Sequence, residues 1–298
     1  MGRLLRNSIV FPLVIVGFVL LLLLPKNVDV QQEGALSFSA DYPFTFDLYK
    51  RNIEQFIGHL WTEKGFGETR SGVPLTEHGE RYLKRSMKVI VAAFGLSMVL
   101  GSLLGVWFFF LRDKWLGKLF SSLGWALASI PDFFLFIICQ YGLILLMQKG
   151  FPEFNLFSSD DWYSFIIPSL ALTIYPLFHM IKMTLVTMDH ESSQEYVRTV
   201  LSKGMTRSRT TVHIFWNALS TILNQSHMVL LYILSSLPII EKLSNYNGAG
   251  YQLLESILDD EVIWAFMFFL PFLAMMFIVM VLVELARIWL LPRDVSHV

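Results

Sequence analysis

The side chains best suited to chemistry or binding gather in one polar interval, residues 195–213, between long apolar runs. The basic residues in this interval and just before it are Lys182, Arg198, Lys203, Arg207 and Arg209. A single acid, Glu195, opens the interval. The interval matches no catalytic motif, and its excess of basic residues fits a segment on the inner side of a membrane.

The same interval predicts two short helices that meet at Gly204. Val197, Val200 and Leu201 stand at i, i+3 and i+4, so the first helix has an apolar stripe beside its basic face. Gly204 suits the left-handed backbone position that closes a helix, and Thr206 suits the N-cap of the next helix. The simpler alternative is an ordinary basic loop on the inner side of a membrane.

The sequence lacks the motifs of common hydrolytic and nucleotide-binding sites. The patterns G-x-x-x-x-G-K-[ST], H-E-x-x-H and G-x-S-x-G are all missing. The ionisable residues inside apolar segments are Asp132, His179, His227 and Glu284. Their spacing makes no nucleophile–base set, and His179 has no second ligand at metal-site spacing. We therefore expect no catalytic residue, no metal and no cofactor in this chain.

The composition is that of a membrane protein. Of 298 residues, 54% are hydrophobic and 16% are charged, and the mean hydropathy is +0.55. Soluble domains carry about 25% charged residues. The single cysteine, Cys139, rules out a disulfide within the chain. A formal net charge of −1 says little about partners, so the distribution of charge matters more.

Six apolar segments are long enough to cross a bilayer as helices. The predicted spans are residues 8–24, 87–111, 120–147, 162–188, 219–240 and 262–291. A cleaved signal peptide is the alternative for the first, but no small-x-small site follows it. Residues 25–85 are polar and are expected outside the cytoplasm, with an amphipathic helix over residues 46–61. The predicted fold class is an all-α membrane protein with six transmembrane helices.

The distribution of charge places both termini in the cytoplasm. Residues 1–7, 189–218 and 292–298 are predicted inside, and each of these segments carries Lys or Arg. The two short outside loops carry mainly acids, namely Glu153, Asp160, Asp161, Asp259, Asp260 and Glu261. The basic residues that do not follow this pattern stand at the outer end of the second span and are Arg81, Lys84, Arg85 and Lys88.

Three features inside the spans predict local structure. Gly101 and Gly105 belong to a small-residue stripe that allows another helix to approach closely. Residues 129–132, Ser-Ile-Pro-Asp, interrupt the third span because proline removes a backbone donor. The acid at their end either faces a polar environment or caps a helix. Glu284 and Arg287 are three residues apart and are expected to pair on one helix face.

Residues 196–204, Tyr-Val-Arg-Thr-x-x-x-Lys-Gly, strongly resemble the cytoplasmic EAA loop of ABC-transporter permeases, in the form used by the oligopeptide, dipeptide and nickel importer family. Residues 167–173, Ile-Pro-Ser-Leu-Ala-Leu-Thr, resemble the start of the helix before that loop. Glu241 with Asn-Gly-Ala-Gly at 247–250 is similar to the family's Glu-x-x-[FY]-x-x-Pro-Gly-x-Gly turn, with Asn247 in place of proline.

This resemblance implies the fold of a type I ABC importer permease, with residues 86–291 as its core and an extracytoplasmic segment between the first two spans. Such a subunit forms a translocation pathway with a second permease. Two ATP-binding subunits, which hold the ATP, attach below, and an extracytoplasmic substrate-binding protein delivers the substrate, here expected to be a peptide. The implied location is the plasma membrane of a bacterial or archaeal cell. The loop departs from the family at Thr199-Val200, where Thr-Ala is usual, and near Ser220, where a proline is missing.

The resemblance also assigns a docking role to the loop at 189–218. The residues expected to contact the ATPase subunits are Glu195, Tyr196, Arg198, Thr199, Lys203, Gly204 and Met205. The alternative function is a membrane receptor or assembly subunit that uses the basic loop to anchor a soluble partner without transport. A stable complex with ATPases whose hydrolysis responds to an external binding protein would distinguish the two.

Overall fold

The structure is a computed structural model that describes the chain except for residues 1, 26–28, 33–37, 42–43, 64, 69–73, 113, 116–123, 125, 127–128, 153–160 and 291–298. The predicted cytoplasmic tail, 292–298, and two of the predicted outside acids, Glu153 and Asp160, lie outside this description. The chain forms two compact units. They comprise Met1–Leu83 with Gln252–Leu273, and Lys84–Tyr251 with Ala274–Val298.

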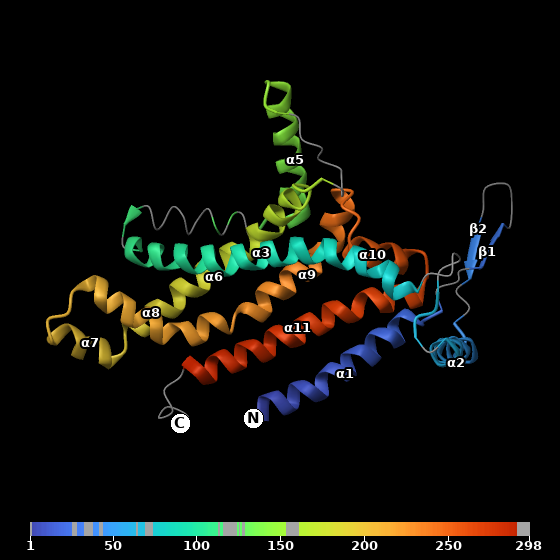
Figure 1. The fold of residues 1–298 in the computed structure, drawn as a ribbon, viewed down its shortest axis with the longest axis horizontal. Helices are drawn as coiled ribbons and strands as arrows, with labels where there is room; N and C mark the ends of the chain where they lie inside the picture. Colours follow the sequence, from blue (N-terminus) through green and yellow to red (C-terminus); the bar gives the residue numbers. More distant parts are fainter. Residues whose placement is uncertain are drawn as a thin grey trace. The chain divides into compact units, whose positions relative to one another are not determined.

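The first unit combines helices with one small pair of strands (Figure 1). Its complete elements are α1 (Gly2–Leu22), β1 (Asp29–Gln32), β2 (Phe38–Asp41) and α2 (Phe46–Thr62). It also holds parts of α3 (Leu75–Leu111), α10 (Ala249–Leu258) and α11 (Val262–Leu290). The strands are antiparallel, with Asp29 opposite Asp41. The all-α prediction missed this hairpin because a search for long apolar runs does not detect short strands in a polar segment.

Helix α3 begins earlier than the apolar run indicated. It starts at Leu75, inside the segment predicted to be a loop, rather than near Met87. Leu75 and Tyr82 are buried, and the Tyr82 ring meets the Phe268 ring edge-on with centroids 6.1 Å apart. The His78 ring meets the Trp264 ring in the same way at 5.9 Å. This extension is helical because its apolar face packs on the start of α11.

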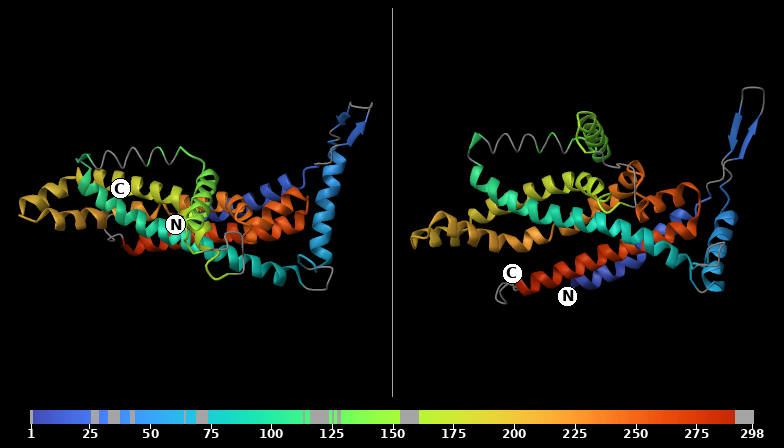
Figure 2. Two further views of the ribbon diagram at one scale, coloured as in Figure 1. Left: turned by 90° about the horizontal axis from the view of Figure 1, so that it is seen from above. Right: turned by 45° about the horizontal axis from the view of Figure 1, so that its top comes forward.

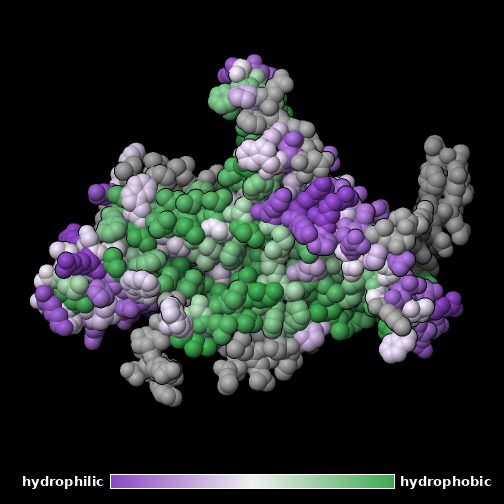
Figure 3. Space-filling model, in the orientation of Figure 1, coloured by the Kyte–Doolittle hydropathy of each residue, from purple (hydrophilic) through white to green (hydrophobic). Residues whose placement is uncertain are grey.

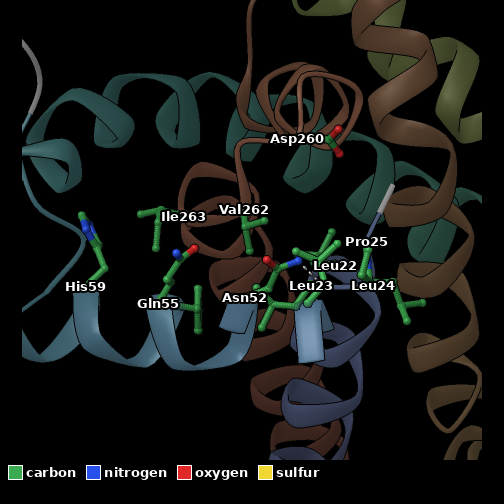
Figure 4. Close-up of a pocket in the computed structure, with 12 residues that line it drawn as sticks. Leu22, Leu23, Leu24, Pro25, Asn52, Gln55, His59, Asp260, Val262 and Ile263 are labelled. Carbon is green, nitrogen blue, oxygen red and sulfur yellow. Dashed lines mark hydrogen bonds between the residues drawn. The ribbon is translucent and has the colours of Figure 1, made fainter. Parts of the chain in front are cut away.

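Helix α2 is the predicted amphipathic helix, and it covers the end of α1. The Thr45 hydroxyl accepts a hydrogen bond from the Leu48 N–H (3.3 Å) and so caps α2. The Asn52 amide donates to the Leu23 carbonyl at 3.1 Å, which satisfies a group left unpaired at the end of α1. A cavity of about 420 Å³ lies beside this contact, between α1, α2 and the turn before α11 (Figure 4). Trp61, by contrast, is 84% exposed.

The second unit is helical throughout its described part. It contains α5 (Asp132–Gln148), α6 (Ile166–Ser192), α7 (Glu195–Ser202), α8 (Arg207–Leu223) and α9 (Ser226–Leu243), with the remainders of α3 and α11. Helix α6 is central, because it packs against α5, α8 and α9 (Figures 1 and 2). Helix α7 packs against α8. These contacts place the polar interval of the sequence at one end of α6.

Four described helices are long and apolar enough to cross a membrane, namely α3, α6, α9 and α11. Two shorter apolar helical stretches are Val10–Leu22 in α1 and Phe133–Gln148 in α5. Figure 3 shows hydrophobic side chains along α6, α9 and α11, and hydrophilic ones over α7 and the start of α8. The protein is therefore a helical membrane protein.

The third and fifth apolar segments differ in detail from their prediction. Helix α5 begins at Asp132, directly after Pro131, where the interruption was predicted; the side chain of Asp132 and most of 120–128 lie outside the description. The predicted fifth span, 219–240, begins inside α8 and crosses a break at Asn224 and Gln225 before α9. No glycine or proline marks that break, so residue type gave no sign of it.

The small-residue stripe of α3 packs against α6, as predicted. A Cβ added at Gly101 would lie 2.5 Å from Met180 Cβ, and one at Gly105 would lie 2.5 Å from Thr184 Cβ. Real Cβ atoms do not approach so closely, so the two helix backbones depend on glycine at both positions. The close approach fixes α3 against the helix that carries the polar loop.

Candidate functional site

The polar loop, residues 189–218, begins in the last turn of α6 and is linked by an ion pair to the end of α3. The Arg112 guanidinium, at the end of α3, pairs with the Asp189 carboxylate near the end of α6. The hydroxyls of Ser192 and Ser193 donate to the Asp189 carbonyl at 2.7 and 3.3 Å, where α6 stops. These hydrogen bonds close the last turn of α6. The loop therefore begins from a fixed point.

The inner face of α7 is held by Val197 and Tyr196. Val197 is 5% exposed, and the Tyr196 hydroxyl donates to Glu191 Oε2 at 3.2 Å. A further hydrogen bond joins Tyr196 to Asn217 of α8. Burial and the nearby Glu191 charge raise the pKa of Tyr196. The hydrogen bond with Asn217 acts in the opposite direction but does not cancel this rise. The hydroxyl therefore keeps its proton at neutral pH and joins α6, α7 and α8.

The turn between α7 and α8 confirms the role predicted for Gly204. Its φ is +78°, in the left-handed region. The Gly204 N–H donates to the Leu201 carbonyl (2.9 Å) and the Met205 N–H to the Val200 carbonyl (3.4 Å), the two bonds of a Schellman motif. Thr206 is the N-cap residue of α8, as predicted, but its side chain makes no capping hydrogen bond. The angle between the two helices is thus set by the glycine turn.

The outer face of α7 and the turn presents most of the predicted docking residues. Those exposed are Glu195, Arg198, Thr199, Lys203 and Gly204, whereas Tyr196 and Met205 are half-buried and position the helix. Leu201, which belongs to the predicted apolar stripe, is 49% exposed. Only Val197 of that stripe is fully buried, since α8 covers one side of α7. An exposed leucine among basic groups adds an apolar contact to this surface.

This arrangement has the chemistry of a docking surface. The Thr199 hydroxyl bonds back to the Glu195 carbonyl at 3.3 Å, so it serves its own helix. Among the described residues, no three His, Cys, Asp or Glu side chains lie close enough to hold a metal ion. Cationic groups around an apolar residue on a stiff short helix suit contact with another protein.

A second constellation, which sequence analysis assembled only in part, surrounds Glu241 at the end of α9. Glu241 is fully buried, and its Oε1 accepts a hydrogen bond from Ser86 Oγ at 2.5 Å. Its Oε2 accepts from the Tyr251 N–H at 2.8 Å, and Ser86 Oγ accepts from the Ala249 N–H at 2.7 Å. The two side chains therefore satisfy the first N–H groups of α10. The sequence indicated Glu241 but gave no sign of Ser86.

The glycine turn beside Glu241 leaves room for these bonds. A Cβ added at Gly248 would lie 2.5 Å from both Glu241 Oε2 and Ser86 Oγ. The Tyr246 hydroxyl donates to the Arg85 carbonyl at 3.2 Å, and the Arg85 guanidinium donates to the Asn247 carbonyl at 3.2 Å. Burial, and then the charge of Glu241, raise the pKa of Tyr246 to about 12 despite the nearby Arg85. This cluster joins α3 to the turn between α9 and α10.

The predicted pair on α11 is present, with an additional partner. Arg287 Nη1 lies 3.1 Å from Glu284 Oε2, and both side chains are about one quarter exposed. Arg287 Nε also donates to Ser220 Oγ of α8 at 3.2 Å. The pair therefore links α11 to the second helix of the loop, a contact that spacing within one helix does not reveal.

Comparison with known proteins gives a family. Residues 83–293 match the family described as binding-protein-dependent transport system inner membrane component. A Brucella abortus (strain 2308) protein provisionally named as a peptide transport system permease is 28% identical over 273 residues, 87% of each chain. The dipeptide transport system permease protein DppB of Bacillus subtilis (strain 168) is 29% identical over 224 residues, covering 73% of this chain and 70% of its own.

A more distant relative broadens the range of named substrates. The putrescine export system permease protein SapB of Escherichia coli (strain K12) is 23% identical over 223 residues, 64% of this chain and 68% of its own.

The region that matches the family, residues 83–293, includes the α7–α8 loop and the Glu241 cluster. The chain belongs to the family of binding-protein-dependent transport system inner membrane components and is a permease subunit of an ABC importer.

Proposed function

We propose that this permease forms, with a second permease subunit, the membrane pathway for peptide uptake. The names of the relatives from Brucella abortus and Bacillus subtilis support peptide as the substrate class. Two ATP-binding subunits bind the ATP, and this chain holds no cofactor of its own. An extracytoplasmic substrate-binding protein delivers the peptide to the complex in the plasma membrane of a bacterial or archaeal cell.

The proposed topology has six spans with both termini in the cytoplasm. It counts α1 and the third apolar segment, 120–147, as spans in addition to the four longer helices, and it places residues 25–85 outside the cytoplasm. The acids of the short outside loops and the basic groups of α7 and α8 support it. Local partners are seen for basic residues at the outer end of α3. Arg85 bonds to Asn247, and the Arg81 guanidinium lies 5.5 Å from the Tyr82 ring centroid.

The ATPase subunits are proposed to dock on the exposed face of α7 and the turn after it. The observation that carries this proposal is the left-handed turn at Gly204, which, together with the hydrogen bonds of Tyr196 to Glu191 and Asn217, fixes the short helix α7 against α6 and α8. A partner that changes shape with nucleotide must push on a stiff element for the movement to reach the spans. Arg198, Lys203 and the exposed Leu201 supply the contact.

The alternative is a receptor or assembly subunit that anchors a soluble partner without transport. It is not favoured, because the relatives that span most of this chain are named as transport system permeases. The Glu241 cluster and the close packing of α3 on α6 lie outside the loop, and a subunit that only anchors a soluble partner would need neither of them.

Cross-linking tests the proposed docking face. In a Cys139→Ala background, Arg198→Cys is labelled with a thiol-reactive, photoactivatable cross-linker in the assembled complex and irradiated, and Lys50→Cys on α2 is the matched control. Both positions are exposed, but only Arg198 lies on the proposed surface. We expect an adduct with an ATPase subunit at 198 and none at 50. An assembled complex that gives no adduct at 198 would show that the ATPases dock elsewhere.

A further inference from the structure

The second unit contains a cavity of about 350 Å³ between the turn before α5 and the helices α6 and α9. Its lining includes Ser129 from the turn, Leu172 and Tyr175 from α6, and Tyr232 and Ser236 from α9. Both long helices are apolar enough to cross the membrane. The lining is mainly apolar but includes hydroxyl groups, and polar groups between such helices require a physical reason, because unpaired polar groups in hydrocarbon are costly.

Two prolines line this cavity. Pro176 lies within α6 and also lines the cavity. It has no N–H, so the Leu172 carbonyl four residues earlier loses its usual helical donor. Pro131 lines the opposite side and precedes the first residue of α5. Helix α6 continues through Pro176, and a backbone carbonyl left without its helical donor at membrane depth is tolerated where it lines a cavity.

An aromatic cluster supplies the polar side chains. The Tyr175 and Tyr232 rings meet edge-on with centroids 4.8 Å apart, and their side chains are hydrogen-bonded. The His179 ring, which is not among the lining residues, also meets the Tyr232 ring edge-on, with centroids 5.3 Å apart. His179 bonds to Gln225, while its buried Nε2 has no hydrogen-bond partner among the described residues. The cavity is thus bordered by ring faces and neutral hydrogen-bonding groups.

Among the described residues that line the cavity, none carries a formal charge. Its groups are hydroxyls, ring faces and a backbone carbonyl, which together offer both donors and acceptors. The matching ligand is a neutral chain of amides. A pathway must also bind its cargo weakly enough to release it, which neutral contacts allow. We propose that this cavity contacts the peptide backbone of the substrate during passage, an inference that rests on the function proposed above.

Uptake kinetics test this assignment. The complex, with its ATPases and binding protein, is placed in proteoliposomes, and ATP-dependent uptake of a dipeptide with blocked ends is measured. Tyr175→Leu and Tyr232→Leu remove the hydroxyls and ring faces, and Ser236→Leu fills the space. We expect each to lower uptake by about tenfold, equivalent to about 1.4 kcal/mol, while the complex keeps its ATPase subunits and hydrolyses ATP. The matched control is Tyr141→Leu on α5, because Tyr141 is 62% exposed and does not line the cavity. It should transport normally.

The outcomes separate the two levels of the proposal. Absence of ATP-dependent peptide uptake by the wild-type complex would overturn the proposed function itself. Normal wild-type uptake together with normal uptake by Tyr175→Leu, Tyr232→Leu and Ser236→Leu would overturn the cavity assignment alone and would indicate a space filled by lipid. Tyr232→Phe keeps the ring and removes only the hydroxyl, so a smaller loss than for Tyr232→Leu would support the role of the ring face.

Discussion

Glu241 and Ser86 together close the amino end of helix α10. The Ser86 hydroxyl donates to the Glu241 carboxylate at 2.5 Å, and each side chain accepts a backbone N–H from the start of α10. The two residues are 155 positions apart in the sequence. One buried carboxylate thus connects three helices, because Ser86 lies on α3 and Glu241 on α9. A carboxylate is well placed there, since the helix amino end carries partial positive charge.

Glu241→Ala is expected to destabilise the purified protein. The change leaves the Tyr251 N–H and the Ser86 hydroxyl without their acceptor, and each unsatisfied buried group costs about 1–3 kcal/mol. Glu241→Gln retains one acceptor oxygen and should be intermediate. Thermal unfolding in detergent, followed by size-exclusion chromatography, measures the order. The exposed Glu261→Ala should match wild type, and a Glu241→Ala protein as stable as that control would show that the cap contributes little.

Gly105→Val is expected to disrupt the packing of α3 on α6. Its Cβ would overlap Thr184 Cβ at 2.5 Å and approach the Ile181 carbonyl at 3.1 Å, and overpacking of this kind costs about 1–3 kcal/mol. Gly95 lies on the same helix with nothing within 4 Å of an added Cβ. Gly95→Val should therefore be nearly neutral. Equal melting temperatures for the two valine variants would contradict the close approach of the helices.

For the Glu284–Arg287 pair on α11, we expect a double variant to be more stable than a single variant. Glu284→Leu leaves Arg287 half-buried without its carboxylate, whereas the double change Glu284→Leu with Arg287→Leu removes both charges. A lone charge in a poorly solvated place costs more than none, so the double variant should melt at the higher temperature. Arg287 keeps its bond to Ser220 in the single variant, which limits the difference. A double variant clearly less stable than Glu284→Leu would mean that the charges do not stabilise each other.

Accessibility labelling tests the proposed topology. In a Cys139→Ala background, which removes an exposed thiol, single cysteines replace the exposed residues Glu63, Glu261 and Ser208. A membrane-impermeant thiol reagent added to intact cells should label 63 and 261, which are proposed outside, and leave 208 unlabelled. Permeabilised cells should label all three. Labelling at 208 in sealed cells would contradict the six-span arrangement.

Features whose residues lie close together in the sequence were predictable. The left-handed turn follows from a glycine after a short amphipathic helix, and its φ of +78° agrees. The close approach of a neighbouring helix to α3 follows from glycines four residues apart, although the sequence did not indicate that this helix is α6, and the Glu284–Arg287 pair follows from helical spacing. In each case one helix or one turn contains the whole signal.

Features that depend on distant partners were not predictable. Ser86 is an unremarkable serine until the fold brings it to Glu241. Leu201 fits an apolar stripe by spacing, but α8 covers the other side of α7 and leaves it exposed. The early start of α3 likewise depends on aromatic residues of α11, since the Leu75 region is too polar to indicate a span. Tertiary packing determines the environment of these residues, and the sequence alone does not show which distant residues pack together.

We propose that α7 and the turn at Gly204 transmit the ATPase movement to the membrane, and the Gly204→Val variant tests this coupling. A β-branched residue at a positive φ costs on the order of 1–2 kcal/mol, which a folded helical bundle tolerates but a docking surface does not. Gly150→Val is the matched control, because Gly150 has a φ of +95° and, like Gly204, nothing within 4 Å of an added Cβ. For both variants, ATPase subunits retained on purification and ATP-dependent peptide uptake are measured together. We expect normal expression of both variants, with loss of ATPase retention or of peptide uptake only for Gly204→Val. Wild-type retention and uptake for Gly204→Val would show that this turn does not couple the ATPase subunits to transport.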